Sequence, residues 1–167
     1  MIVILSFRTK IPKGEQKMPV QIPSKWDKEV DVVVLGTGGA ALTAAIAAAD
    51  GGASVLVLEK THQIGGTTAY SGGVPWIPLN HYMQEAGFQD NREEAIQFIE
   101  RLALGRADKK MIETFVDNAH IMIKYLAEHT PTRFATPLSY PEYYARMGEA
   151  LKQGTRSLDP LPYNLNE

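Results

Sequence analysis

The chain has 167 residues, which is enough for one ordinary domain whose core buries about 70% of the unfolded surface. Its 17 basic and 19 acidic residues give a formal net charge of −2, so nucleic acid is not an expected partner. The absence of cysteine excludes a disulfide scaffold, a cysteine-ligated metal and a thiol nucleophile, and it makes a cytoplasmic location the expectation. The sequence shows no transmembrane segment, although peripheral attachment to a membrane stays open.

In chain order, residues 1–28 combine prolines and charges without periodicity, and we expect a flexible lead-in there. The short β-branched run Val30–Leu35 is typical of a strand covered on both faces in a parallel sheet. A glycine turn follows, then the small-residue helix Ala40–Ala49 and a second strand over Ser54–Leu58. This pattern predicts one βαβ unit of an α/β, Rossmann-like fold, within a region spanning residues 29–80.

Residues 81–167 are predicted to be a helical segment that leads into the start of a substrate-pocket region. The glycine, threonine and serine of Gly65–Gly73 indicate a loop. Asp90–Glu93 resembles a capping box that opens a helix, and Asp108 opens another helix that ends before Pro131. Two confident strands are too few for a complete parallel sheet, so this fold is incomplete without downstream sequence.

The turn has the pattern G-x-G-x-x-A, with Gly36, Gly38 and Ala41 at the small positions. The two glycines permit a sharp turn and a close approach of a pyrophosphate to the helix N-terminus, while Ala41 lets the helix lie close to the strands. Glu59, at the end of the second strand, is placed to accept hydrogen bonds from an adenosine ribose. The alternative is a structural glycine turn with a solvated glutamate. Cofactor contacts are also assigned to three neighbours in the sequence, Gly39, Ala40 and Lys60.

A second glycine loop follows the second strand, and it suits a long ligand such as FAD. Its N–H groups and hydroxyls offer further hydrogen bonds beside the first turn, which an NAD site does not need. The alternative is a surface loop rich in turn-forming residues. The residues assigned to cofactor binding in this loop are Gly65, Gly66, Thr67, Thr68, Ser71, Gly72 and Gly73.

The run Asp31–Pro78 resembles the FAD-binding region of the fumarate reductase and succinate dehydrogenase flavoprotein superfamily. It is most similar to the 3-ketosteroid dehydrogenase branch, in which "AYSGG" is followed by a tryptophan-centred segment ending in proline, here Val74–Pro78. The resemblance continues to "PEYYARMGEALKQGTRSLDPLPYN". It implies an N-terminal part of an oxidoreductase that desaturates a 3-ketosteroid at the 1,2 bond, with hydride transfer to N5 of the flavin.

The resemblance also bears on how FAD is held and on which residues react. Residues 66–71 contain no histidine, the residue that binds the flavin covalently in succinate dehydrogenases, so non-covalent FAD is implied. Tyr143, the first tyrosine of "PEYY", matches a pocket tyrosine that supports a second, basic tyrosine, and it is the predicted catalytic residue. Two roles stay open for Arg156, a contact with the flavin region or an ion pair with an acidic residue such as Asp159. No metal site is predicted.

Two other functions remain open at this point. A fumarate reductase-like or enone reductase uses the same N-terminal half, and a non-catalytic nucleotide-binding fragment would have to fold alone. The substrate implied by the resemblance is a small steroid-like molecule, and the electron acceptor is unknown. Because the second half of such enzymes supplies the base and further FAD contacts, we expect the isolated chain to bind FAD weakly or not at all, without turnover.

Overall fold

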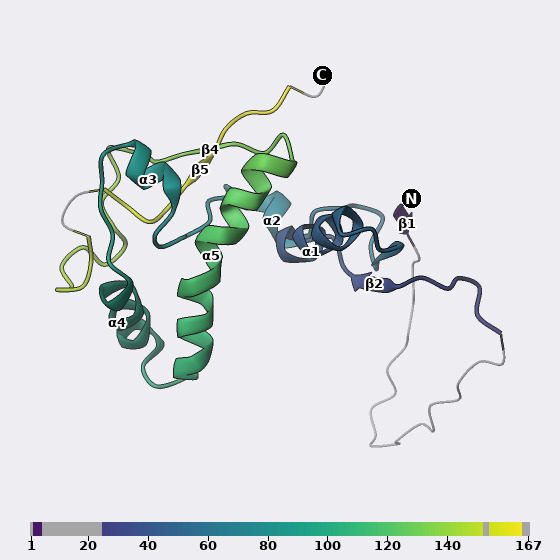
Figure 1. Ribbon diagram of the computed structural model, residues 1–167, viewed down its shortest axis with the longest axis horizontal. Coiled ribbons are helices and arrows are strands. Elements are labelled where there is room, and N and C mark those ends of the chain that lie inside the picture. The colour runs from purple at the N-terminus through teal and green to yellow at the C-terminus, as the bar shows by residue number, and fades with distance from the viewer. Residues whose placement is uncertain (1, 5–24, 152–153, 165–167) are drawn as a thin grey trace. The chain divides into compact units, whose positions relative to one another are not determined.

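The computed structural model describes the backbone of residues 2–4 together with residues 25–151 and 154–164 (Figure 1). These residues belong to two compact units, residues 1–71 and residues 72–167. The boundary follows Ser71, so it divides the second glycine loop between the two units.

The first unit is built on a parallel sheet with strand order β1-β3-β2. The predicted strands are β2 (Val32–Leu35) and β3 (Val55–Glu59), joined by α1 (Gly39–Asp50), so the predicted βαβ unit is confirmed. A third strand, β1 (Ile2–Ile4), pairs with β3 although the sequence predicted a flexible lead-in there. Residues 5–24 of that lead-in lie outside the described part of the chain.

One face of this sheet is packed and the other is open. Val34 and Val57 contact Ala45 of α1, and Ala41 packs at the margin of the same cluster. Val33 and Leu35, which the pleat directs to the opposite face, are 53% and 77% exposed. The expectation that β2 is covered on both faces therefore does not hold, because α1 covers one face and no described element of this unit covers the other.

The second glycine loop contains a short helix, α2 (Gly66–Tyr70), where the sequence predicted only a loop. Gly65 precedes it with a φ of 109°, a left-handed conformation that side-chain-bearing residues rarely adopt. Composition alone favoured a loop because glycine and threonine have low helix propensity. The tight turn at Gly65 nevertheless starts one helical turn.

The second unit contains α3 (His81–Glu85), α4 (Arg92–Ala103) and α5 (Lys109–His129). Each begins with an accepting side chain, because Asn80, Asn91 and Asp108 receive hydrogen bonds from backbone N–H groups of the first turn. The helix predicted to open at Asp108 and to end before Pro131 is thus confirmed. The cap of α4 is Asn91, which leaves the carboxylate of Asp90 for another contact.

Two apolar clusters hold the second unit together, and α4 and α5 lie side by side in it (Figure 1). The first cluster joins these helices through Ala95, Ile96, Ile112 and Val116. The second cluster connects α5 to flanking segments through Ile77, Ala119, Ile123 and Leu158. The short strands β4 (Phe134–Ala135) and β5 (Asp159–Pro160) pair antiparallel, which joins the segment after α5 to the last part of the described chain. Backbone hydrogen bonds from Ile77 to Arg156 and from Leu158 to Pro75 join that last part to the segment before α3.

Candidate functional site

The glycine turn connects the end of β2 to the N-terminus of α1. Gly36 has a φ of 93°, and its N–H donates a 2.6 Å hydrogen bond to the carbonyl of Leu58 on β3. Gly38 is the N-cap of α1 and has no side chain to shield the helix end. The first-turn N–H groups of a helix lack partners within the helix and form its positive end, so this turn suits a phosphate group.

The second glycine loop packs directly on the first. A Cβ placed on Gly66 would lie 3.2 Å from the Cα of Gly38, so a side chain at Gly66 would push the two loops apart. The N–H of Gly39 donates to Oγ1 of Thr68 at 3.0 Å, and the N–H of Gly65 donates to Oγ1 of Thr37 at 2.9 Å. The two glycine loops, distant by almost thirty residues, therefore form one surface.

Thr37 and Glu59 are buried directly beneath the surface that the two loops form. Oγ1 of Thr37 donates to Oε2 of Glu59 at 2.6 Å, and the N–H of Thr61 donates to Oε1 at 3.0 Å. These hydrogen bonds, led by that from Thr37, lower the pKa of Glu59 below its ordinary value, so the carboxylate is ionised at neutral pH. A carboxylate can accept about four hydrogen bonds, and Glu59 also receives the hydroxyl of Thr61 at 3.3 Å and the backbone N–H of Lys60. A ribose hydroxyl would therefore replace the long contact from the Thr61 hydroxyl.

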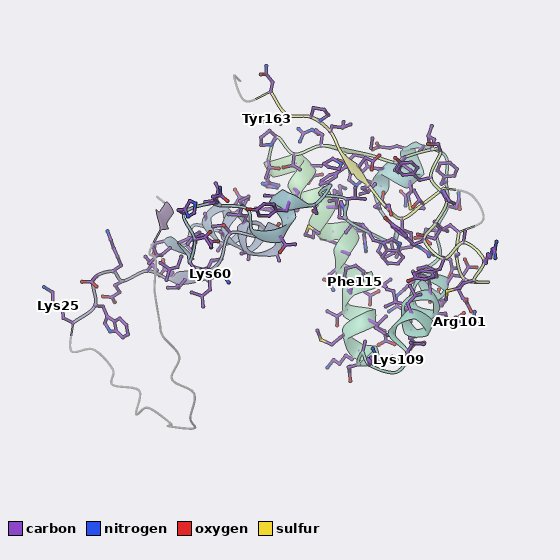
Figure 2. The ribbon with its side chains drawn as sticks, turned by 180° about the vertical axis from the view of Figure 1, so that it is seen from behind. Lys25, Lys60, Arg101, Lys109, Phe115 and Tyr163 are labelled. Atoms are coloured by element: carbon purple, nitrogen blue, oxygen red, sulfur yellow. The ribbon has the colours of Figure 1, made fainter. Side chains whose placement is uncertain are left out.

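A cavity of about 550 Å³ opens where these elements meet. A second hollow of about 840 Å³ shares Glu59, Lys60 and Gly66 with it, and Lys60 is labelled in Figure 2. The first cavity is lined by Leu35, Gly36, Thr37, Gly38, Leu58, Glu59, Lys60, Gly66 and Thr67. Glycine backbone, hydroxyls, a helix N-terminus and an acid at a strand end are the groups that hold a dinucleotide pyrophosphate and ribose, so the residues fit FAD.

The remaining predicted cofactor residues lie in other places. Ala41 packs against the strands, in keeping with its expected spacing role, and Ala40 is exposed beside it. Ser71 ends α2, where its Oγ donates to the carbonyl of Thr68. Gly72 and Gly73 belong to the second unit, and Gly73 approaches Pro160 there.

The second unit contains an apolar cavity of about 250 Å³ that includes Tyr143. We call it the tyrosine cavity; it is lined by Trp76, Phe98, Ile99, Leu102, Tyr143 and Tyr144. The side chains of Tyr143 and Tyr144 are 63% and 66% exposed, so a ligand seated here would cover them. The sequence predicted Tyr143 alone; its neighbours are contributed by α4 and by the tryptophan segment, which are remote in the chain.

Arg156 lies fully buried beneath this cavity. Its guanidinium forms a two-pronged pair with Asp90, the shortest contact being 2.7 Å, and Nη1 donates to Oε2 of Glu142 at 3.4 Å. The cation lies 5.4 Å from the ring centre of Trp76 and 5.5 Å from that of Phe98. The acidic partners are therefore Asp90 and Glu142 rather than Asp159.

Glu142 completes this buried cluster of charges. Its side chain has no exposed area, and Oε1 accepts the indole N–H of Trp76 at 2.9 Å. Burial raises the pKa of Glu142 above its ordinary value, and the hydrogen bond from Trp76 and the charge of Arg156 oppose that shift. The sequence placed Asp90 in a capping box and Glu142 in the "PEYY" motif, but it did not predict their burial with Arg156, because a charged residue in a loop gives no local sign of burial.

Among the described residues, no helix is both long and apolar enough to cross a membrane. The same residues contain no group of three or more histidine or acidic side chains that could hold a metal ion.

Comparison with known proteins agrees with this geometry. Residues 31–161 match the family model described as "FAD binding domain". The chain is 39% identical over 135 residues to a 4-oxocyclohexanecarboxylate 2-dehydrogenase from Sinomonas cyclohexanicum, covering 81% of this chain and 23% of that protein. It is 36% identical over 138 residues to a 3-oxosteroid 1-dehydrogenase from Comamonas testosteroni, covering 83% of this chain and 24% of that protein.

A solved structure supports the same relationship. The 3-ketosteroid Δ1-dehydrogenase from Sterolibacterium denitrificans, crystallised with 1,4-androstadiene-3,17-dione, matches with a TM-score of 0.71 and 35% identity over 79% of this chain and 23% of that chain. The chain thus spans about a quarter of the length of these relatives. With most of its residues matched, the chain belongs to the FAD binding domain family, among the flavoprotein oxidoreductases related to fumarate reductase and 3-ketosteroid dehydrogenase.

Proposed function

We propose that this chain is the N-terminal part of a longer FAD-dependent oxidoreductase that desaturates a 3-ketosteroid at the 1,2 bond. The observation that carries the proposal is the joining of two glycine loops around Thr37 and Glu59, which fits a long dinucleotide. The reaction class, dehydrogenation of a cyclic ketone, is proposed from the similarity to proteins named as dehydrogenases of such compounds.

The residues of the first unit would hold the cofactor non-covalently. Gly36 and Gly38 leave the helix N-terminus open to the pyrophosphate, Glu59 would accept the ribose hydroxyls, and Gly66 and Thr67 would extend the contact along the ligand. FAD supplies the acceptor for a hydride removed from the substrate carbon. The protein's part is to bind the cofactor and to orient the substrate ring.

The tyrosine cavity would receive part of the substrate ring system. Its walls are aromatic and aliphatic side chains, and the exposed phenol of Tyr143 is free to approach a reacting group or a second tyrosine. A tyrosine that removes a proton from the substrate must do so as its phenolate, and phenols are largely protonated at neutral pH. A hydrogen bond from Tyr143 would stabilise the phenolate of the second tyrosine and so favour removal of the substrate proton. Tyr143 therefore takes a supporting catalytic role in this proposal.

The cavity favours a neutral ring over a carboxylated one. None of the described residues that line it is charged, and the guanidinium beneath it is buried and paired with Asp90 and Glu142. A substrate carboxylate at this position would lose its hydration without gaining a cation. This distinction matters because one relative is named for a cyclohexanone carboxylate and others for a steroid.

The test begins with the DNA downstream of the Glu167 codon, where an open frame of several hundred residues is expected. The encoded protein is then assayed with a dye acceptor, comparing 4-androstene-3,17-dione with 4-oxocyclohexanecarboxylate. We expect turnover of the steroid, and a Tyr143→Phe variant with unchanged FAD content but a kcat lower by about a hundredfold. A preference for the carboxylate would overturn the steroid assignment, and a protein without FAD would overturn the oxidoreductase assignment.

A further inference from the structure

The buried carboxylate of Glu142 gathers donors from three separate segments. Oε1 accepts the indole N–H of Trp76 at 2.9 Å and the backbone N–H of Tyr143 at 3.2 Å, while Oε2 receives Nη1 of Arg156 at 3.4 Å. Trp76 and Arg156 are remote from Glu142 in the sequence, whereas Tyr143 is its neighbour. The Glu142 side chain therefore connects its own segment to the tryptophan segment and to the residues just before β5.

Two of these donors belong to the wall of the tyrosine cavity. Trp76 and Tyr143 both line it, although they are more than sixty residues apart in the sequence. Arg156 reaches the same wall from beneath, since its cation lies against the faces of Trp76 and Phe98. The rings of Trp76 and Phe98 stack with centres 5.7 Å apart, so Trp76 is held on its face by Phe98 and at its edge by Glu142.

Stability alone gives a weak reason for this arrangement. Two carboxylates and one guanidinium share a dry region, and a buried ion pair can be replaced by apolar side chains with little loss of stability. The hydrogen bonds that Glu142 accepts from an indole N–H and a backbone N–H are directional. They therefore fix the orientation of the groups that donate them, which apolar packing does not do.

We propose that Glu142 and Arg156 are positioning residues of the tyrosine cavity, which fix the plane of Trp76 and the backbone of Tyr143 so that a flat, neutral ring fits between the aromatic side chains. This inference rests on the proposed function for the identity of the ligand. The part of the inference that concerns geometry, namely that Glu142 orients Trp76, does not depend on the identity of the ligand. Neither residue touches the ligand, because both are buried behind the wall.

The chain allows a direct optical test, because it contains only two tryptophans, Trp26 and Trp76. Trp26 is 65% exposed and lies in the first unit, so Trp26→Phe leaves Trp76 as the sole indole reporter. In this background Glu142→Leu removes all three contacts, Glu142→Gln keeps the shape and an acceptor oxygen, and Ile123→Ala is a destabilising control. Ile123 is a core residue that does not line the cavity.

The first readout is the Trp76 emission and near-ultraviolet circular dichroism of the folded 167-residue chain. We expect Glu142→Leu to shift the emission and weaken the dichroism, and Glu142→Gln to change both signals by a smaller but measurable amount, because the amide keeps an acceptor oxygen but loses the charge that pairs with Arg156. Ile123→Ala should retain both signals while lowering Tm. Should Glu142→Leu fail to fold, Glu142→Gln must still change the Trp76 signal measurably. Unaltered signals in a folded Glu142 variant would overturn the inference.

The second readout uses the longer oxidoreductase proposed above, with 4-androstene-3,17-dione as the probe. Glu142→Gln is expected to raise KM by about fivefold or more at unchanged FAD content, whereas Ile123→Ala leaves KM within about twofold. Equal effects of the two variants on KM would overturn the positioning role. Absence of turnover in the unmodified protein would instead overturn the proposed function, and the optical readout would still decide whether Glu142 orients Trp76.

Discussion

The hydroxyl of Thr37 and the carboxylate of Glu59 lie 2.6 Å apart, both buried, at the ends of two adjacent parallel strands. The same hydroxyl accepts the N–H of Gly65 from the second glycine loop. One side chain thus connects the first glycine turn, the acid at the end of β3 and the second loop. If FAD binds here, the orientation of Glu59 toward the ribose depends on Thr37.

A substitution at Thr37 tests this connection. Thr37→Val keeps the volume but leaves the Gly65 N–H without its acceptor and frees Oε2 of Glu59, which then keeps only the hydrogen bonds to Oε1, so we expect FAD affinity to fall by on the order of tenfold. Thr37→Ser retains the hydroxyl and should bind within about threefold of the unaltered protein. Affinity is measured by quenching of flavin fluorescence in the longer protein. Equal affinities for the valine and serine variants would contradict the prediction.

Gly65 is predicted to be intolerant of any side chain. A Cβ there would lie 2.5 Å from the Cβ of Ala69, and the φ of 109° is itself strained for alanine. Gly65→Ala should therefore abolish retention of FAD on purification. Gly52→Ala is the matched control, because Gly52 also has a positive φ, 86°, but a Cβ added there would meet nothing within 4 Å. This variant should lose only about 1–2 kcal/mol of unfolding free energy and should retain FAD.

Glu59 and Glu142 should affect the pH dependence of stability in opposite senses. The pKa of Glu59 is lowered in the fold, chiefly by Thr37, so its contribution is present above the ordinary value and is lost as pH falls through the folded pKa. The pKa of Glu142 is raised, chiefly by burial, so its contribution is present below the ordinary value and is lost as pH rises through the folded pKa.

These signs are checked by thermal melts between about pH 3 and about pH 7. The Tm difference between the unaltered chain and Glu59→Gln should shrink toward acid pH. The difference between the unaltered chain and Glu142→Gln should move in favour of the variant as pH rises. Parallel Tm profiles for the two glutamine variants would show that at least one of the two pKa directions is wrong.

Arg156 should be far more important for stability than an exposed arginine of the same unit. Arg156→Met leaves the buried carboxylates of Asp90 and Glu142 without a cation, and we expect a loss of about 3–5 kcal/mol in unfolding free energy. Arg101, labelled in Figure 2, pairs with Glu149 at 2.6 Å with a side chain 58% exposed, so Arg101→Met should cost about 0–1 kcal/mol. Denaturant unfolding of both variants measures the contrast.

The sequence predicted those features that depend on local pattern. The βαβ unit around Gly36 and Gly38 was identified because strand, turn and helix signals are consecutive. The helix from Lys109 was identified because Asp108 and the apolar spacing agree. The contact of Thr37 with Glu59 was missed, although a hydroxyl between the two glycines, followed by an acid at the next strand end, is a signal that could have found it.

The apolar wall around Tyr143 and the partners of Arg156 could not be predicted in the same way. Trp76 and Asp90 meet residues more than sixty positions later, and nothing in their local sequence specifies that pairing. The open face of β2 is a further case, because a β-branched run indicates burial on two faces without showing which element covers the second.

The connections of Arg156 also suggest an order of folding for the second unit, because they join segments that are far apart in the sequence. The α4–α5 pair is a local hairpin that can form early, with few residues between its helices. The backbone hydrogen bonds from Ile77 to Arg156 and from Leu158 to Pro75 close a loop of about eighty residues, which makes them slow, late events. Arg156 can cover Asp90 and the face of Trp76 only after it has been synthesised, so we expect the burial of this charge to follow the formation of the α4–α5 pair.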